Sequence, residues 1–411
     1  MRKISVVLLT AAFAVGLTGC SAPDSGSGAT TISFAHWGNN EENATMEAMV
    51  AAFEAEHPDI DIEAEWIQAD YEQRLQTTIA GGSQATVAQI GNTMLAAFAN
   101  AFRPVEVDPD LYYSANTARS MQFDGEYLAV PFVAKPKVMA VNAAVFEDAG
   151  VEPPTADRAL TIDEFDELAQ QVTSGTAPDK TYGSARLWFN GWLVAEGGAF
   201  YNDDATACTL DSPEALETTE DLIAAQSPDG YAPTQLDAEG QDMFDWLGIG
   251  RLAMQPDFGP WDIAKLVALD DPAIDLVPVP GDGSLLEFNG LGISASASDE
   301  EAEAAQTFVD FMSTAPAAQD LLTTSESSLG VPIIEESLAA FLDAAPDKNL
   351  QAFVDALDQS TIDPSVANDN QIRTAFDDVI YSDTALGAGD EDPATVLADF
   401  NVECQSILDS E

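Results

Sequence analysis

Thr31-Ile-Ser-Phe-Ala-His-Trp37 and Ile60-Asp-Ile-Glu-Ala-Glu-Trp66 are the two stretches that decide the fold class of this chain. Both alternate apolar and polar residues, which is typical of a β-strand with one buried face. The segment between them repeats apolar residues at helical spacing and ends at His57-Pro58, where proline stops a helix. A strand, a helix and a second strand in this order predict a βαβ unit with parallel strands.

The alternation of strands and helices continues after Trp66. A helix is expected from about Asp70 to Gly81-Gly82, and residues 87–90 follow as a short buried strand. Three strand–helix units in series predict a doubly wound α/β domain. In such a domain, ligands bind at the loops after the carboxyl ends of the strands. Those loops carry His36, Trp37, Asn39, Asn40, Glu41, Tyr71, Gly91 and Asn92.

Length and charge bound the possible partners. Without its leader the 411-residue chain is too long for one ordinary core, so two domains are expected. It has 14 Lys+Arg against 71 Asp+Glu, a formal net charge of −57. Such a charge repels nucleic acid and anionic membranes, so neither is an expected binding partner. The acidic residues are scattered along the chain, which favours a solvated folded surface over disorder. High ambient salt is an alternative explanation of the acidity.

The amino terminus predicts export. Arg2 and Lys3 precede a short apolar segment and Leu17-Thr-Gly-Cys20, so residues 1–19 are predicted to be a signal peptide. The ending resembles a bacterial lipobox, which makes Cys20 the expected lipidation site. Residues 20–31 are rich in Gly and Ser, as a flexible tether would be. The protein is therefore expected on the extracellular face of the cell membrane, anchored there by lipid; the alternative is an ordinary signal cleaved nearby.

Two further cysteines remain, Cys208 and Cys404. In an oxidising compartment such a pair predicts one disulfide that ties the C-terminal helix to the body of the protein. Two separate buried thiols are the alternative.

A second informative stretch is Gly250-Arg-Leu-Ala-Met-Gln-Pro-Asp-Phe-Gly-Pro-Trp-Asp262. Proline fixes φ and glycine permits tight turns, so Trp261 is expected at a fixed bend between a strand and a helix. An indole held in this way suits a binding platform, although a core tryptophan beside a turn explains the same pattern.

The residues offer little material for catalysis or metal binding. His36 and His57 are the only histidines, and no nucleophile elbow, zinc-protease, phosphate-loop or calcium-loop motif occurs. No cofactor or metal is expected. A glycosidase with paired carboxylates stays open, because any two of 71 acids could meet.

Aromatic residues beside amide and charged residues are the more informative pattern. Sugars are bound by flat apolar rings that stack on them and by polar groups that bond their hydroxyls, so the pattern predicts a carbohydrate cleft. The aromatics are Trp37, Tyr71, Phe132, Trp188, Trp192, Phe258 and Trp261.

The chain resembles the extracellular solute-binding lipoproteins of carbohydrate ABC importers, the maltose-binding-protein-like group. The resemblance spans nearly the whole mature chain and rests on the order and spacing of HWG, HPDIDIEAEW, FDGEYLAVPF, VNAAVFEDAGV, NGWLVAEGGAFYNDD, CTLDSPEALE, GRLAMQPDFGPWD and FNGLGISASASDEEAEAAQTFVDFM. It implies an α/β, two-lobe periplasmic-binding-protein fold with three interlobe crossovers and a ligand cleft at the hinge. The crossovers are placed near Ala134, Asn289 and Val331, which gives an N-terminal lobe of 32–133 plus 290–330 and a C-terminal lobe of 134–289 plus 331–411.

The resemblance also implies a function and a set of ligand contacts. A monomeric, non-enzymatic receptor would capture a sugar or oligosaccharide by lobe closure and deliver it to an ABC permease. Trp261 falls on the aromatic that stacks on the sugar in this family. The other expected ligand contacts, beyond the loop residues given above, are Phe132, Lys135, Trp188, Asn190, Trp192, Asp257, Phe258, Gly259, Asn289, Asn370 and Arg373.

Two departures from the family pattern bear on the ligand. Ala85-Thr86 stands where the family often has Pro-Asp, and a late stacking aromatic is replaced around Asp369-Asn370. The second departure argues against a long maltodextrin and for a different or smaller glycan. The alternatives are a secreted glycoside hydrolase and a binding protein for a polyol, polyamine or peptide.

Overall fold

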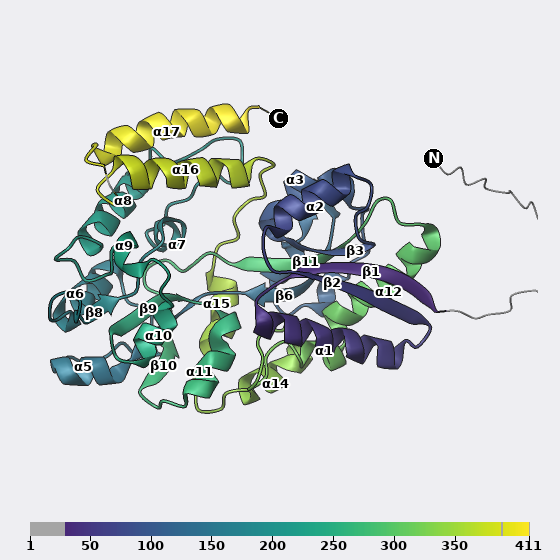
Figure 1. Ribbon diagram of the computed structural model, residues 1–411, viewed down its shortest axis with the longest axis horizontal. Coiled ribbons are helices and arrows are strands. Elements are labelled where there is room, and N and C mark those ends of the chain that lie inside the picture. Colours follow the sequence, from purple (N-terminus) through teal and green to yellow (C-terminus); the bar gives the residue numbers. More distant parts are fainter. Residues whose placement is uncertain (1–28, 388, 411) are drawn as a thin grey trace, which may run out of the picture.

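The computed structural model describes residues 29–387 and 389–410. The predicted signal peptide, Cys20 and residues 21–28 of the predicted tether lie outside these residues. Two β-sheets, each flanked by helices, divide the described chain into an N-terminal and a C-terminal lobe (Figure 1). No described helix combines the length and apolar character needed to span a membrane.

The N-terminal lobe is built on a five-stranded sheet in the order β2-β1-β3-β11-β6. Its strands are β1 (Thr30–Trp37), β2 (Ile60–Ile67), β3 (Val87–Gly91), β6 (Val130–Lys135) and β11 (Glu287–Ile293). The strand β1 pairs in parallel with both β2 and β3, whereas β11 runs antiparallel to β3 and β6. The predicted βαβ unit is therefore confirmed, and β1 begins inside the predicted tether, at Thr30.

The helices of this lobe start where the sequence supplies caps. Asn39 and Glu42 form a capping box at the start of α1 (Asn40–Glu56), and Ser298 and Glu301 form another at α12 (Asp299–Thr314). Phe308 of α12 packs edge-on against Phe34 of β1 and Phe53 of α1, with ring centroids 5.2 and 5.0 Å apart. The remaining elements are α2 (Tyr71–Ala80), α3 (Leu95–Phe98), α4 (Ala115–Arg119), α13 (Pro316–Gln319) and the hairpin β4 (Gln122–Phe123) and β5 (Glu126–Tyr127).

The C-terminal lobe has a four-stranded sheet in the order β10-β7-β9-β8. Its strands are β7 (Val138–Asn142), β8 (Tyr182–Ser184), β9 (Leu252–Phe258) and β10 (Ile274–Val277). Its helices are α5 (Ala143–Ala149), α6 (Ile162–Val172), α7 (Phe189–Ala195), α8 (Pro213–Ala225), α9 (Gln235–Ala238), α10 (Met243–Gly248), α11 (Ile263–Leu269), α16 (Asp369–Asp383) and α17 (Pro393–Leu408). The last two lie side by side along one edge of the lobe (Figure 1).

Three segments carry the chain between the sheets. The first is residues 136–137, between β6 and β7, and the second is residues 278–286, between β10 and β11. The third follows Val331, which exchanges two backbone hydrogen bonds with Ala134 before the chain continues to α14 (Leu338–Asp343) and α15 (Gln351–Gln359). The predicted boundaries at 133/134 and 289/290 fall inside β6 and β11, so they are displaced by a few residues.

Cys208 and Cys404 are joined by a disulfide with a Cα–Cα distance of 6.2 Å. Cys404 lies on the buried face of α17. Around the bond, the backbone N–H of Cys208 donates to Gln405 Oε1 and that of Leu210 to Asn401 Oδ1. The last helix is thus attached to the 200–210 segment both covalently and by hydrogen bonds.

Candidate ligand-binding site

A cavity of about 260 Å³ lies where the two lobes are joined. Four predicted site residues line it: Trp188, Asn190 and Trp192 at the start of α7, and Asp257 at the end of β9. Lys137 from the first crossover, Ser284 from the second and Glu287 from β11 complete its wall. The cavity is therefore built from both crossovers, from β11 and from the C-terminal lobe.

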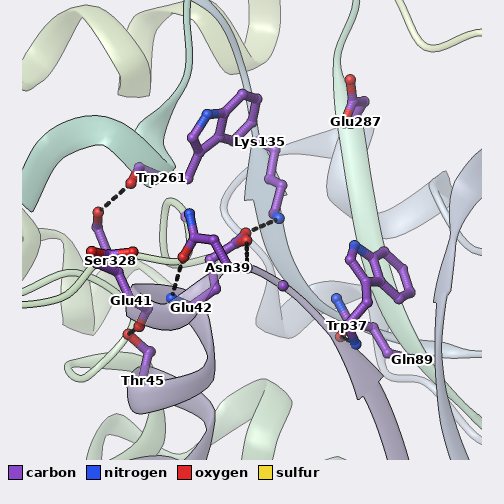
Figure 2. A network of polar contacts seen from close by, with 12 residues as sticks. Trp37, Asn39, Glu41, Glu42, Thr45, Gln89, Lys135, Trp261, Glu287 and Ser328 are labelled. Carbon is purple, nitrogen blue, oxygen red and sulfur yellow. Dashed lines mark hydrogen bonds and ion pairs between the residues drawn. The ribbon is translucent and has the colours of Figure 1, made fainter. Parts of the chain in front are cut away.

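Trp261 stands beside this cavity at a fixed bend. It follows β9 in a 3₁₀ turn, Pro260–Asp262, and its side chain is half-buried. Ser328 Oγ donates to the Trp261 carbonyl oxygen at 3.0 Å, and the Ala264 N–H donates to Ser328 Oγ at 3.3 Å (Figure 2). The Ser328 side chain thus bridges the Trp261 carbonyl and the Ala264 N–H and fixes the backbone that carries the indole.

Gly259 permits the orientation of this indole. A Cβ atom on Gly259 would lie 2.4 Å from two ring carbons of Trp261, so the ring lies directly against the glycine. The backbone of Gly259, at φ −97° and ψ 160°, is open to other residues, and the indole is therefore what requires glycine here.

Replacing Gly259 by alanine should turn the indole out of its position and weaken ligand binding about 10-fold or more, with little effect on folding. Calorimetric titration with a ligand found by thermal-shift screening measures the affinity, and tryptophan fluorescence reports the ring's environment. Gly248→Ala is the matched control, because its new methyl group meets the flexible end of Leu269. Equal affinities for Gly259→Ala and the wild type would refute the role of Gly259.

Two lysines lie over the Trp261 ring, and each is paired with a carboxylate. Lys137 Nζ lies 3.8 Å and Lys135 Nζ 5.6 Å from the ring centroid, as in cation–π contacts. Lys135 also forms a buried ion pair with Glu42 at 2.7 Å, and Lys137 pairs with Glu287 at 3.3 Å. Figure 2 shows Lys135 reaching from β6 to the start of α1 below the indole. The predicted contact Lys135 is therefore held by Glu42, whereas Lys137 is at the cavity wall.

Asp257 adds a polarised carboxyl group to the same wall. Its side chain is reached by solvent from the cavity, but the surrounding protein desolvates it and raises its pKa, while the nearby Lys137 opposes that change. A desolvated carboxylate beside an ammonium group is a strong acceptor for hydroxyl groups.

Trp37 presents a second half-buried indole, at the end of β1. Its ring packs against Tyr71, with centroids 4.7 Å apart. The Tyr71 hydroxyl donates within the lobe, to the carbonyl oxygens of Gln89 (2.8 Å) and Ala35 (3.2 Å), and burial raises its pKa. Tyr71 thus supports Trp37 and has its hydroxyl engaged. The backbone N–H of Trp37 donates to Gln89 Oε1 at 3.3 Å (Figure 2).

The loop after β1 is arranged by helix capping. Asn39 Oδ1 accepts from the Glu42 N–H at 2.8 Å, and Glu42 Oε2 accepts from the Asn39 N–H at 2.9 Å. The Asn39 side-chain oxygen therefore serves α1. Asn40 is exposed and Glu41 partly so, which leaves both accessible at this loop.

Three predicted site residues are core residues, and their assignment as ligand contacts is wrong. Phe132 and Phe258 are fully buried, the latter among Phe244 and Phe353. His36 is 1% exposed and stacks on Phe34. Strand side chains alternate between faces, so these residues point into the lobes and away from the cleft.

The burial of His36 predicts a pH dependence of stability. Desolvation lowers its pKa from 6.5 to about 4, so between these values the unfolded chain binds a proton that the folded chain does not. Stability should therefore fall as the pH drops from about 6.5 to about 4, by roughly 3 kcal/mol from this group. Urea unfolding of the wild type and of His36→Gln across this range measures the difference, which should vanish if His36 is protonated in the fold.

Three of the remaining predicted site residues lie where β3 meets β11. Asn92 Oδ1 accepts from the Phe288 N–H at 2.9 Å, and Gly91 pairs with Asn289 between β3 and β11. Asn289 is buried, and its Nδ2 has no partner among the described residues. These three positions thus lie at the carboxyl end of β3, where it meets β11 inside the sheet.

Asn370 and Arg373 are not brought to the cavity that Trp188 and Trp192 line. Arg373 pairs with Asp363 (2.6 Å) and Asp369 (2.9 Å), and Asn370 Nδ2 donates to Glu72 Oε2 of the opposite lobe at 2.9 Å. Both residues line a separate cavity of about 200 Å³. Ion pairing and an interlobe hydrogen bond thus occupy the polar groups at the start of α16.

Four residues that line the cavity at the lobe junction were not predicted from the sequence: Lys137, Ser284, Glu287 and Arg186. Lys137 could have been found, because Ala-Lys-Pro-Lys places two of only 14 Lys and Arg residues two positions apart in an acidic chain. The described residues contain no cluster of three or more His, Cys, Asp or Glu placed to hold a metal ion.

Two α/β lobes, three crossovers and an aromatic cavity at their junction define a two-lobed binding protein. Residues 48–361 match the model of a family described as bacterial extracellular solute-binding protein, and the chain belongs to that family.

Individual relatives agree with this assignment. An uncharacterised lipoprotein of Streptomyces antibioticus is 27% identical over 75% of this chain and 72% of its own length. The diacetylchitobiose-binding protein DasA of Streptomyces coelicolor is 22% identical over 56% of this chain and 57% of its own. An ABC substrate-binding protein of Listeria monocytogenes, solved with cycloalternan, has a TM-score of 0.81 at 24% identity and covers 93% of this chain and 100% of its own.

Proposed function

We propose that this protein is the sugar-capturing receptor of an ABC importer, anchored by lipid at Cys20 on the outer face of the cell membrane. It acts as a monomer that binds a sugar or oligosaccharide between its lobes, closes, and delivers the ligand unchanged to the permease. The observation that carries the proposal is the rigid Trp261 indole beside a cavity lined by Trp188, Trp192, Asp257, Lys137 and Glu287.

The chemistry of these groups suits a carbohydrate. Indole faces stack on the apolar faces of sugar rings, while carboxylates, amides and ammonium groups bond hydroxyls. Trp37, Asn40 and Glu41 extend the contact surface from the N-terminal lobe. Relatives named for diacetylchitobiose and cycloalternan support the same ligand class.

Lobe closure follows from where the groups lie. Lys137, Ser284 and Glu287 sit on or beside the two crossovers, whereas Trp188 and Trp261 belong to the C-terminal lobe. A ligand that contacts both sets stabilises one lobe arrangement over others by its differential affinity. The permease would then recognise the closed arrangement.

A thermal-shift screen tests the proposal. Purified protein lacking residues 1–19 and carrying Cys20→Ser is screened against mono- and oligosaccharides, polyols, polyamines and peptides. A rise in Tm with at least one neutral sugar is expected, because binding to the folded state alone stabilises it. A response confined to polyamines or peptides would contradict the sugar assignment.

A glycoside hydrolase is the second candidate, because Asp257 and Glu287 line the same cavity. Mass analysis of sugars incubated with the protein separates the two functions. A receptor returns them intact, whereas a hydrolase returns shorter products.

A further inference from the structure

A second, larger hollow adjoins the cavity at Trp188. Its volume is about 990 Å³, and Arg186 and Trp188 line both hollows. The lining of the larger hollow comes from the end of α8, the segment around α9 and the end of α16. Figure 1 shows these three helices in the C-terminal lobe. The first cavity, at about 260 Å³, is small for anything beyond a short ligand, so the two together describe a longer site.

Trp188 and Arg186 form the connection between the hollows. Trp188 is 52% exposed, which is unusual for an indole on a folded surface. The Arg186 guanidinium lies 4.1 Å from the Trp188 ring centroid and 4.9 Å from that of Tyr381. Its Nε donates a long hydrogen bond to Gln226 Oε1 at 3.4 Å. These contacts hold the rings of Trp188 and Tyr381 and the Arg186 guanidinium, a strong hydrogen-bond donor, between the two hollows.

The lining of the larger hollow is apolar and amide-rich, with little charge. Leu236, on α9, is 79% exposed, and the partly exposed Ile223 and Met243 add apolar surface. Gln235 and Gln241 supply exposed amides, while Arg186 and Glu239 are the only charged residues among those that line it. In a chain of net charge −57 such a patch suits a neutral ligand that offers both apolar faces and hydroxyl groups.

We propose that this hollow, termed the α9 groove, binds the outer rings of a neutral oligosaccharide whose first rings occupy the cavity at Trp192. This inference rests on the proposed function, and it adds that the ligand extends past Trp188 along α8 and α9. The shared lining argues for this occupant, because a chain of sugar rings stacked on the exposed Trp188 would contact both hollows.

Titration calorimetry with two length series tests the groove: maltose to maltoheptaose, and chitobiose to chitohexaose. In the series that binds, affinity should rise about 10-fold or more from the dimer to the longest member. The double variant Leu236→Ala/Gln241→Ala should lose most of this gain and bind the dimer as the wild type does. Val402→Ala, which removes an equally exposed apolar side chain from α17, should keep the gain.

Hydrogen exchange adds a readout that does not depend on the variants. The segment 234–243 should gain protection from the longest oligosaccharide and not from the dimer. Two results would contradict the groove inference and leave the proposed function intact: an affinity that does not depend on oligosaccharide length, or a rise in affinity with length that persists in the double variant. If the wild type binds no member of either series, the proposed function fails for these sugars, and the groove inference fails with it.

Discussion

Substituting alanine for Trp261 should lower the affinity for the bound sugar about 100-fold or more, because a central aromatic platform contributes most of the binding energy at such sites. Folding should be little affected, since the indole is half-buried and its carbonyl contact with Ser328 is made by the backbone. Calorimetric titration gives the affinity, and thermal unfolding gives the stability.

Two further variants test whether the loss of affinity is specific to the aromatic face of Trp261. Trp261→Phe keeps an aromatic face and should retain a substantial part of the affinity. Trp246→Phe changes a buried tryptophan in the C-terminal lobe, stacked on Tyr182, and should alter stability more than binding. Unfolding of Trp261→Ala without a selective loss of binding would restore the reading of Trp261 as a core residue.

Removing the disulfide with Cys208→Ser/Cys404→Ser should lower the free energy of unfolding by about 2–5 kcal/mol. The bond joins residues 196 positions apart, so its loss frees the unfolded chain considerably. Denaturant unfolding in the Cys20→Ser background measures the change, and reduction of the parent protein should reproduce it.

Sugar affinity at low temperature should change less than about 3-fold in this variant, because the bond fixes α17 and leaves the Trp261 bend untouched. An unfolding free energy equal to that of the parent would show that the hydrogen bonds of Gln405 and Asn401 suffice to hold the helix.

The fold was predictable where one local pattern dominates. The alternating strands from Thr31 and Ile60 and the helix that ends before Pro58 all correspond to observed elements. The predicted positions of the crossovers were displaced by a few residues, because strand ends are set by pairing between distant segments. Glu287, for example, belongs to β11 through its pairing with Lys135, a contact that no local pattern reveals.

The site was harder to predict, since each aromatic residue alone fits a core or a cleft. Phe258 and Trp261 are three positions apart, yet the first is in the core and the second is at the cleft. The difference arises from the turn at Gly259-Pro260, which ends the alternation of β9. Lys137 was missed because its contact with Trp261 exists only once the first crossover meets the end of β9.

The central claim is that the cleft beside Trp261 binds a sugar and releases it unchanged. Titration calorimetry of the wild type with the sugar that gives the largest thermal shift, followed by mass analysis of the recovered ligand, tests it most directly. We predict saturable binding of one sugar per chain and an intact ligand. Failure of every neutral sugar to bind, or recovery of a shortened one, would contradict the account.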